Sequence, residues 1–177
     1  VANDRSNPNG KRDAGDIRAR ILTETGWSEA VSQSQWNNSA WNAVIGFSPD
    51  GSEVYLSGHY NNDGQAANSQ GISVSRKTAT GWSRPENIYI PYFINRSNGT
   101  GLWLNANADV MVYAAATPLS GGAEDLYITR LGTEGWEEPR SLGAIVNSGF
   151  QELAPSLSTD GKKLDRKSTR LNSSHVS

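Results

Sequence analysis

Short runs of apolar and polar residues along this chain predict β-strands rather than helices. Glu53–Ser57 and Asp109–Ala114 place apolar residues at neighbouring positions, with turn-forming residues just before them. Strands with apolar side chains on both faces belong in a sheet that is covered on both sides. We therefore expect an all-β protein whose short strands are joined by tight turns.

A Gly-Trp pair recurs at nearly constant spacing and indicates an internal repeat. It occurs three times, at 26–27, 81–82 and 135–136, so the tryptophans lie 55 and 54 residues apart. A strand-like run ending in Thr or Glu precedes each pair. Pro85 and Pro139 each stand three residues after a tryptophan, which extends the match beyond the dipeptide.

An Asp-Gly turn keeps the same period. Asp50-Gly51 and Asp160-Gly161 each separate two apolar runs, and their glycines lie two repeats apart, whereas the middle copy at 104–114 lacks Asp-Gly. Asp-Gly favours a hairpin because glycine accepts a positive φ and Asp tolerates one. Each repeat thus reads as strand, tight turn, strand, longer loop, strand, Gly-Trp turn and strand.

Four strands per repeat of about 55 residues predict the blades of a β-propeller, because a single blade must stack on its neighbours to cover its faces. We expect residues 1–164 to form a partial propeller, with two complete four-stranded antiparallel blades and two incomplete ones. The blades would be a half blade at 14–35, complete blades at 41–90 and 99–142, and a truncated blade at 150–164.

Within this register, the first strand of each blade would line the central channel: 42–47, 101–104 and 150–157. Trp27, Trp82 and Trp136 would act as apolar wedges between blades, since each indole buries a large area. Because complete propellers have four or more blades, we expect the chain to be a fragment of a larger propeller.

The last thirteen residues, 165–177, do not continue the repeat. They are polar and carry three basic residues against one acidic residue. They resemble translated adapter sequence, and we expect a non-native, disordered tail that plays no part in function.

The phrases PDGSEVYLS, AEDLYITR and ELAPSLSTDGKKL resemble the WD-like propeller repeat of the TolB type. Their pairing with GWSRPENI and GWEEPRSLGAIVNS looks like the propeller region found ahead of OmpA-type peptidoglycan-binding domains. The resemblance covers residues 14–164 and implies a non-catalytic scaffold in the periplasm or at the outer membrane. It transfers no binding residue, because the shared residues build the blade.

The amino-acid composition limits the kinds of partner that the chain is expected to bind. Sixteen basic and 18 acidic residues give a net charge of −2, which does not favour nucleic acid or an anionic membrane surface. The chain has no cysteine and hence no disulfide or zinc-thiolate site. No apolar run is long enough to insert in a membrane, and we expect any signal peptide to lie upstream.

No catalytic, cofactor-binding or metal-binding residue is assigned. Glu152 is the one carboxylate on the expected inner strands, whereas glycoside hydrolysis needs a pair. His59 is the only histidine before the tail, and it is interpreted as a loop residue. The pairs Glu124-Asp125 and Glu137-Glu138 are expected at solvated edges. The loop 59–71 could hold Ca²⁺, but with Asp63 as its one carboxylate an ordinary loop is favoured.

The Asn- and Gly-rich connection at 94–101, together with four aromatic residues, could form a binding rim at the channel mouth: Trp41, Tyr60, Tyr92 and Trp103. The leading hypothesis is a non-catalytic envelope propeller that binds a protein, peptidoglycan or another glycan. The alternative is a regulatory propeller of a hydrolase or peptidase whose catalytic domain is not in this chain. A carbohydrate-active propeller enzyme is ranked last. Nothing in the sequence indicates an oligomeric state.

Overall fold

The computed structural model of the protein describes residues 15–97, 101–121, 123–158 and 160–169. These residues form five antiparallel sheets, none closed on itself, and they contain no helix and hence no helical membrane span. The all-β prediction is therefore confirmed for this part of the chain. Residue 14 of the expected half blade, residues 98–100 of the 94–101 connection and residues 170–177 of the tail lie outside the described residues.

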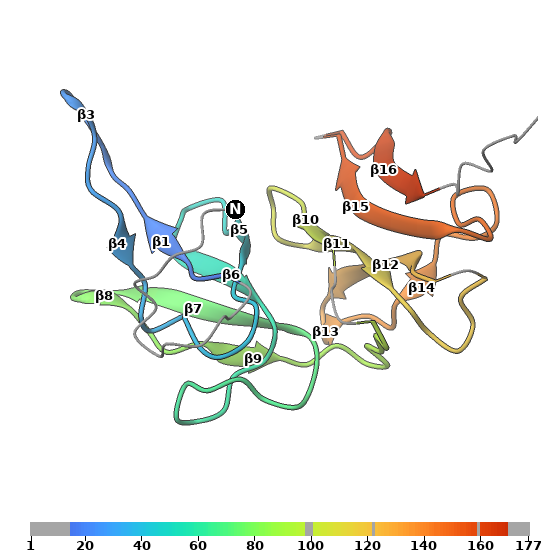
Figure 1. Ribbon diagram of the computed structural model, residues 1–177, viewed down its shortest axis with the longest axis horizontal. Helices are drawn as coiled ribbons and strands as arrows, with labels where there is room; N and C mark the ends of the chain where they lie inside the picture. Colours follow the sequence, from blue (N-terminus) through green and yellow to red (C-terminus); the bar gives the residue numbers. More distant parts are fainter. Residues whose placement is uncertain (1–14, 98–100, 122, 159, 170–177) are drawn as a thin grey trace, which may run out of the picture. The chain divides into compact units, whose positions relative to one another are not determined.

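The chain divides into two compact units, residues 1–88 and 89–177. The main sheet of the first unit is five-stranded, and both β8 and β9 pair with β7 (Figure 1). Its strands are β5 (Val44–Phe47), β6 (Glu53–Ser57), β7 (Ile72–Thr78), β8 (Gly81–Trp82) and β9 (Glu86–Ile88). The expected strand at 53–57 is confirmed with the same bounds.

The main sheet of the second unit has the same strand order (Figure 1). Its strands are β10 (Leu102–Leu104), β11 (Val110–Ala115), β12 (Asp125–Gly132), β13 (Gly135–Trp136) and β14 (Arg140–Ser141). Here β12 takes the place of β7 and pairs with both β13 and β14. The repeat seen in the sequence is thus a repeat of strand topology.

A third copy of the Gly-Trp hairpin lies at the start of the first unit. Its short strands are β1 (Arg18–Ala19), β2 (Leu22–Thr23), β3 (Gly26–Trp27) and β4 (Val31–Ser32), with β1 paired to β4 and β2 to β3. In the three hairpins Trp27, Trp82 and Trp136 hold the same register against the preceding strand. The glycine before each tryptophan has a positive φ, which a residue with a side chain rarely adopts.

A two-stranded hairpin completes the second unit. It consists of β15 (Gln151–Leu157) and β16 (Leu164–Thr169), joined by the Asp160-Gly161 turn. Asp165–Thr169 was expected to begin a disordered tail, but these residues pair with β15. The sheet therefore continues past the position where the sequence repeat ends, because strand pairing needs only backbone groups.

The core of each unit is aromatic. In the first unit Trp36, Val54, Leu56 and Tyr60 form a buried cluster, and the rings of Trp36 and Trp82 meet edge to face with centroids 5.5 Å apart. In the second unit Tyr113 stacks on Phe93 and Tyr127, with ring centroids 4.5 and 5.7 Å apart. Strands β6 and β11 bury residues of both faces, as their sequences predicted.

The three repeat tryptophans differ in burial. Trp136 is 7% exposed, and Trp82 is partly buried against the core of the first unit. Trp27 is 66% exposed, so the expected wedge role does not extend to it among the described residues. The register of the hairpin is set by its glycine and backbone pairing, whereas burial depends on what packs over the indole.

Candidate functional site

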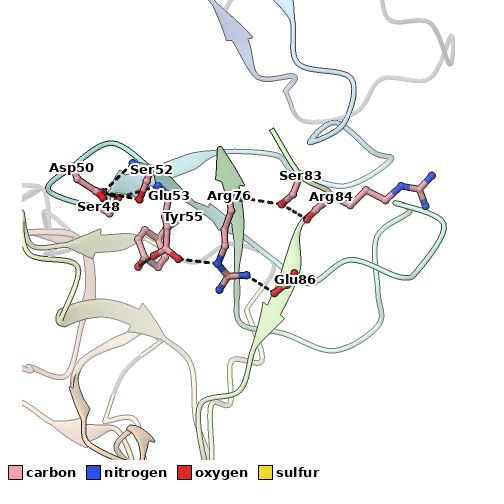
Figure 2. Close-up of polar contacts among 9 residues, drawn as sticks. All are labelled: Ser48, Asp50, Ser52, Glu53, Tyr55, Arg76, Ser83, Arg84 and Glu86. Atoms are coloured by element: carbon pink, nitrogen blue, oxygen red, sulfur yellow. Dashed lines mark hydrogen bonds and ion pairs between the residues drawn. The ribbon is translucent and has the colours of Figure 1, made fainter. Parts of the chain in front are cut away.

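The Asp-Gly hairpins are built by a network of side chains bonded to the backbone. Asp50 accepts hydrogen bonds at Oδ1 from the Ser48 hydroxyl (2.6 Å) and from both the backbone N–H and the hydroxyl of Ser52 (3.0 and 2.7 Å) (Figure 2). These bonds, led by that from Ser48, lower the pKa of Asp50 from 3.8 to about 2. Asp50 is thus a structural residue of the turn.

The second Asp-Gly hairpin repeats this arrangement. Asp160 Oδ1 accepts from the Ser158 hydroxyl at 2.6 Å, and its pKa is likewise lowered, first by that bond. Gly51 and Gly161 have φ values of +66° and +68°. The four turn residues assigned from the sequence therefore stabilise the hairpins, the two Asp residues through their carboxylates and the two glycines through their positive φ.

The middle hairpin, between β10 and β11, has the same backbone conformation at its turn but is built from different residues. Asn105 stands where serine stands in the other two, and its Oδ1 accepts from the backbone N–H groups of Asp109 and Val110 at 2.9 Å. Ala108 stands in the place of glycine with a φ of +58°. The turn survives because the Asn105 amide replaces the hydroxyl and the fold tolerates a strained alanine.

A charged network crosses the first main sheet (Figure 2). Glu53 on β6 faces Arg76 on β7, and its Oε1 accepts from Arg76 Nε at 2.9 Å. Glu53 Oε2 accepts from the Tyr55 hydroxyl at 2.8 Å, while Glu86 of β9 holds the Arg76 Nη1 group. The hydrogen bond to Glu86 is the largest cause of a raised pKa at Arg76. Two carboxylates thus bind one guanidinium on this face.

Glu124 and Asp125, which were expected at a solvated edge, are buried. They are 8% and 5% exposed, so this prediction is wrong. Residues of β15 cover them: Gln151 Nε2 donates to Glu124 Oε2 at 2.6 Å, and the Glu152 N–H donates to the Glu124 carbonyl at 2.8 Å. The residues near 124–125 do not indicate that a strand beginning 27 residues later covers them. The other pair, Glu137 and Glu138, is exposed as predicted.

The inner-strand carboxylate Glu152 is fully buried and held by hydroxyl groups. Its Oε1 accepts from Ser148 and Ser168 at 2.5 and 3.0 Å. Burial would raise the pKa of Glu152, but these bonds outweigh it and the pKa lies below its ordinary value. Burial raises the pKa of Asp125, and the nearby charge of Glu152 adds to the effect. These contacts are structural.

The His59 side chain lies within hydrogen-bonding distance of groups that hold the 59–71 loop in place. Its Nδ1 lies 2.9 Å from the Ser69 hydroxyl and its Nε2 lies 3.3 Å from the Ile88 carbonyl. Burial lowers the pKa of His59. Any side chain at position 71 would come within 2.3 Å of the imidazole, so Gly71 is required there. Asp63 accepts from the Gln65 N–H at 2.9 Å.

The four residues of the expected rim have different surroundings. Trp41 and Tyr92 are 62% and 74% exposed, and both are available to a partner. Trp103 on β10 lines an apolar cavity of the second unit. Tyr60 is 5% exposed and its hydroxyl donates to the Trp36 carbonyl at 2.7 Å. Tyr60 therefore belongs to the core of the first unit rather than to a binding surface.

Two asparagines with a repeated role were missed by sequence reasoning. Asn37 binds both backbone groups of Ile17: Oδ1 accepts from the N–H at 2.7 Å and Nδ2 donates to the carbonyl at 3.1 Å. Asn147 binds Leu126 in the same way, at 2.8 and 3.1 Å. We call these two pairs the asparagine clamps. Their spacing of 110 residues equals that of the Asp-Gly turns and could have revealed them.

No group of three or more acidic, histidine or cysteine side chains in the described ranges could hold a metal ion. No protein-family model, curated protein or solved structure matches the chain.

Proposed function

We propose that the two five-stranded sheets are blades of a β-propeller that acts as a non-catalytic binding scaffold in the bacterial envelope. The observation that carries this proposal is the recurrence of one strand topology, with the Gly-Trp hairpin in the same register each time. Strands β6 and β11 bury residues on both faces, as the middle strands of stacked blades must.

The binding role is supported by where the polar and aromatic side chains are used. His59, Asp50 and Glu152 are all committed to hydrogen bonds within the fold. Trp41 and Tyr92 instead expose most of their side chains. Exposed aromatic rings suit stacking on sugar rings or peptide groups, which fits peptidoglycan as the envelope polymer. The envelope assignment itself rests on the resemblance of the repeats to TolB-type blades.

Sedimentation of the chain with purified peptidoglycan sacculi tests this function. We expect the folded 177-residue chain to pellet with sacculi, and Trp41→Ala to lower the affinity about tenfold, as loss of an aromatic anchor does. Trp27→Ala is the matched control, because Trp27 is exposed to a similar extent but lies outside the expected rim. A folded chain that stays in the supernatant, or equal losses for both variants, would contradict peptidoglycan binding.

A further inference from the structure

The second unit contains a cavity of about 280 Å³ on one face of its main sheet. Its wall is mostly apolar, and it combines residues of β10, β11 and β12 with residues of the β15–β16 hairpin. The lining residues that matter here are Trp103, Val110, Val112, Ile128, Arg130 and Leu157. All of them lie in the second unit, so the cavity does not involve the first unit.

The two main sheets differ in charge at equivalent positions of this face. In the first sheet Glu53 faces Arg76 across the strands, and in the second Val110 faces Arg130 in the same register. Next to this pair, Glu86 faces Val74 in the first sheet, whereas Arg140 faces Ile128 in the second. Both carboxylates that bind the first arginine are therefore replaced, one by valine and one by a second arginine.

This replacement leaves Arg130 at an apolar cavity without a carboxylate. No hydrogen bond or ion pair joins the Arg130 or Arg140 side chain to another described residue. Asp109, the neighbour of Val110, is already engaged, since its carboxylate accepts from Asn105 Nδ2 at 2.6 Å. Cross-strand partners and residues two apart share a sheet face, so both arginines stand on the face that carries the cavity.

We propose that this cavity binds a small organic acid with an aromatic or branched apolar body. The apolar part fits between Trp103, Val112 and Leu157, and the carboxylate binds the Arg130 guanidinium at the mouth. Guanidinium and carboxylate match in charge and in hydrogen-bonding geometry. The cavity volume is close to the smallest volumes found for ligand pockets, so the ligand must be a small molecule.

Calorimetric titration of the 177-residue chain with 2-naphthoate tests the proposal, with 2-naphthalenemethanol as the neutral probe. We expect saturable binding of the acid. The alcohol should bind at least about tenfold more weakly, because it lacks the carboxylate that accepts a hydrogen bond from the charged guanidinium. Arg130→Gln should weaken binding of the acid by a similar factor and leave that of the alcohol nearly unchanged. Higher salt should weaken only the acid.

Two further variants test whether acid binding depends on Arg130 in particular rather than on any arginine of the chain. Val110→Glu places a carboxylate opposite Arg130, as Glu53 stands opposite Arg76, and should abolish acid binding while the chain stays folded. Arg76→Gln is the matched control, because Arg76 holds the equivalent position in the other sheet, and it should leave affinity unchanged. No binding by the folded wild-type chain, or equal affinity of wild type and Arg130→Gln, would overturn the proposal.

Discussion

Gly51 and Ala108 occupy the same position of two hairpins and share almost the same backbone, with φ values of +66° and +58°. Glycine adopts this conformation freely, whereas an L-residue with a side chain is strained in it. In each hairpin the N–H of this residue donates to the carbonyl three residues earlier at 2.9 Å: Gly51 to Ser48, and Ala108 to Asn105. Of these two hairpins, only the one with Ala108 carries this strain, and there Asn105 Oδ1 accepts hydrogen bonds from two backbone N–H groups.

Gly51→Ala should lower the free energy of unfolding by about 1 kcal/mol without preventing folding, since a Cβ at this position meets no other atom and only backbone strain is added. Urea denaturation measures the change. Gly132→Ala is the control, because its φ is not positive and its new Cβ would make ordinary contacts only. Equal stability of Gly51→Ala and wild type would show that the turn relaxes.

Asp50 should titrate far below an ordinary carboxyl group. Its pKa is about 2 in the folded chain against 3.8 as a reference, so its ionised form stabilises the turn above pH 4. That contribution is lost as the pH falls from about 4 towards 2. The ¹³C shift of the Asp50 carboxyl carbon measures the midpoint. Ser48→Ala should move it upwards, because the largest cause of the depression is removed; an unmoved midpoint would contradict this account.

Trp136→Ala should cost about 3–5 kcal/mol of unfolding free energy, the range for removal of a buried large aromatic side chain. Trp27→Ala should cost within about 0.5 kcal/mol, because its indole is mostly exposed. Chemical denaturation followed by circular dichroism compares them. If Trp136→Ala does not fold, Trp136→Phe should still show a clear loss. Equal costs at the two positions would mean that burial does not set their energetic weight.

Spin labels can test whether the two units behave as adjacent blades. The sequence has no cysteine, so Pro49→Cys with Ala106→Cys, at equivalent exposed positions of two hairpins, gives a single labelled pair. Stacked blades should give one narrow distance distribution, because their facing side chains interlock. Pro49→Cys with Arg84→Cys, both in the first unit, supplies the reference width. A broad distribution for the first pair would contradict the propeller proposal.

Much of the local structure could be predicted from the sequence, because it is encoded by neighbouring residues. The strand at Glu53–Ser57 and the Gly-Trp hairpins follow from short patterns and glycine conformation. The burial of Glu124 and Asp125 could not be predicted, because it depends on β15, which is distant in the chain. The exposure of Trp27 and the burial of Tyr60 likewise depend on packing rather than on residue type.

The asparagine clamps have a consequence for how such a chain can diverge. Each clamp joins an amide to a peptide unit 20 or 21 residues earlier, and it recognises main-chain atoms that every amino acid possesses. Substitutions at the recognised positions therefore leave the junction intact, provided that proline is excluded. The loops that the clamps close are short, so they can form early in folding. Duplicated segments could thus drift apart in side chains while keeping a common length.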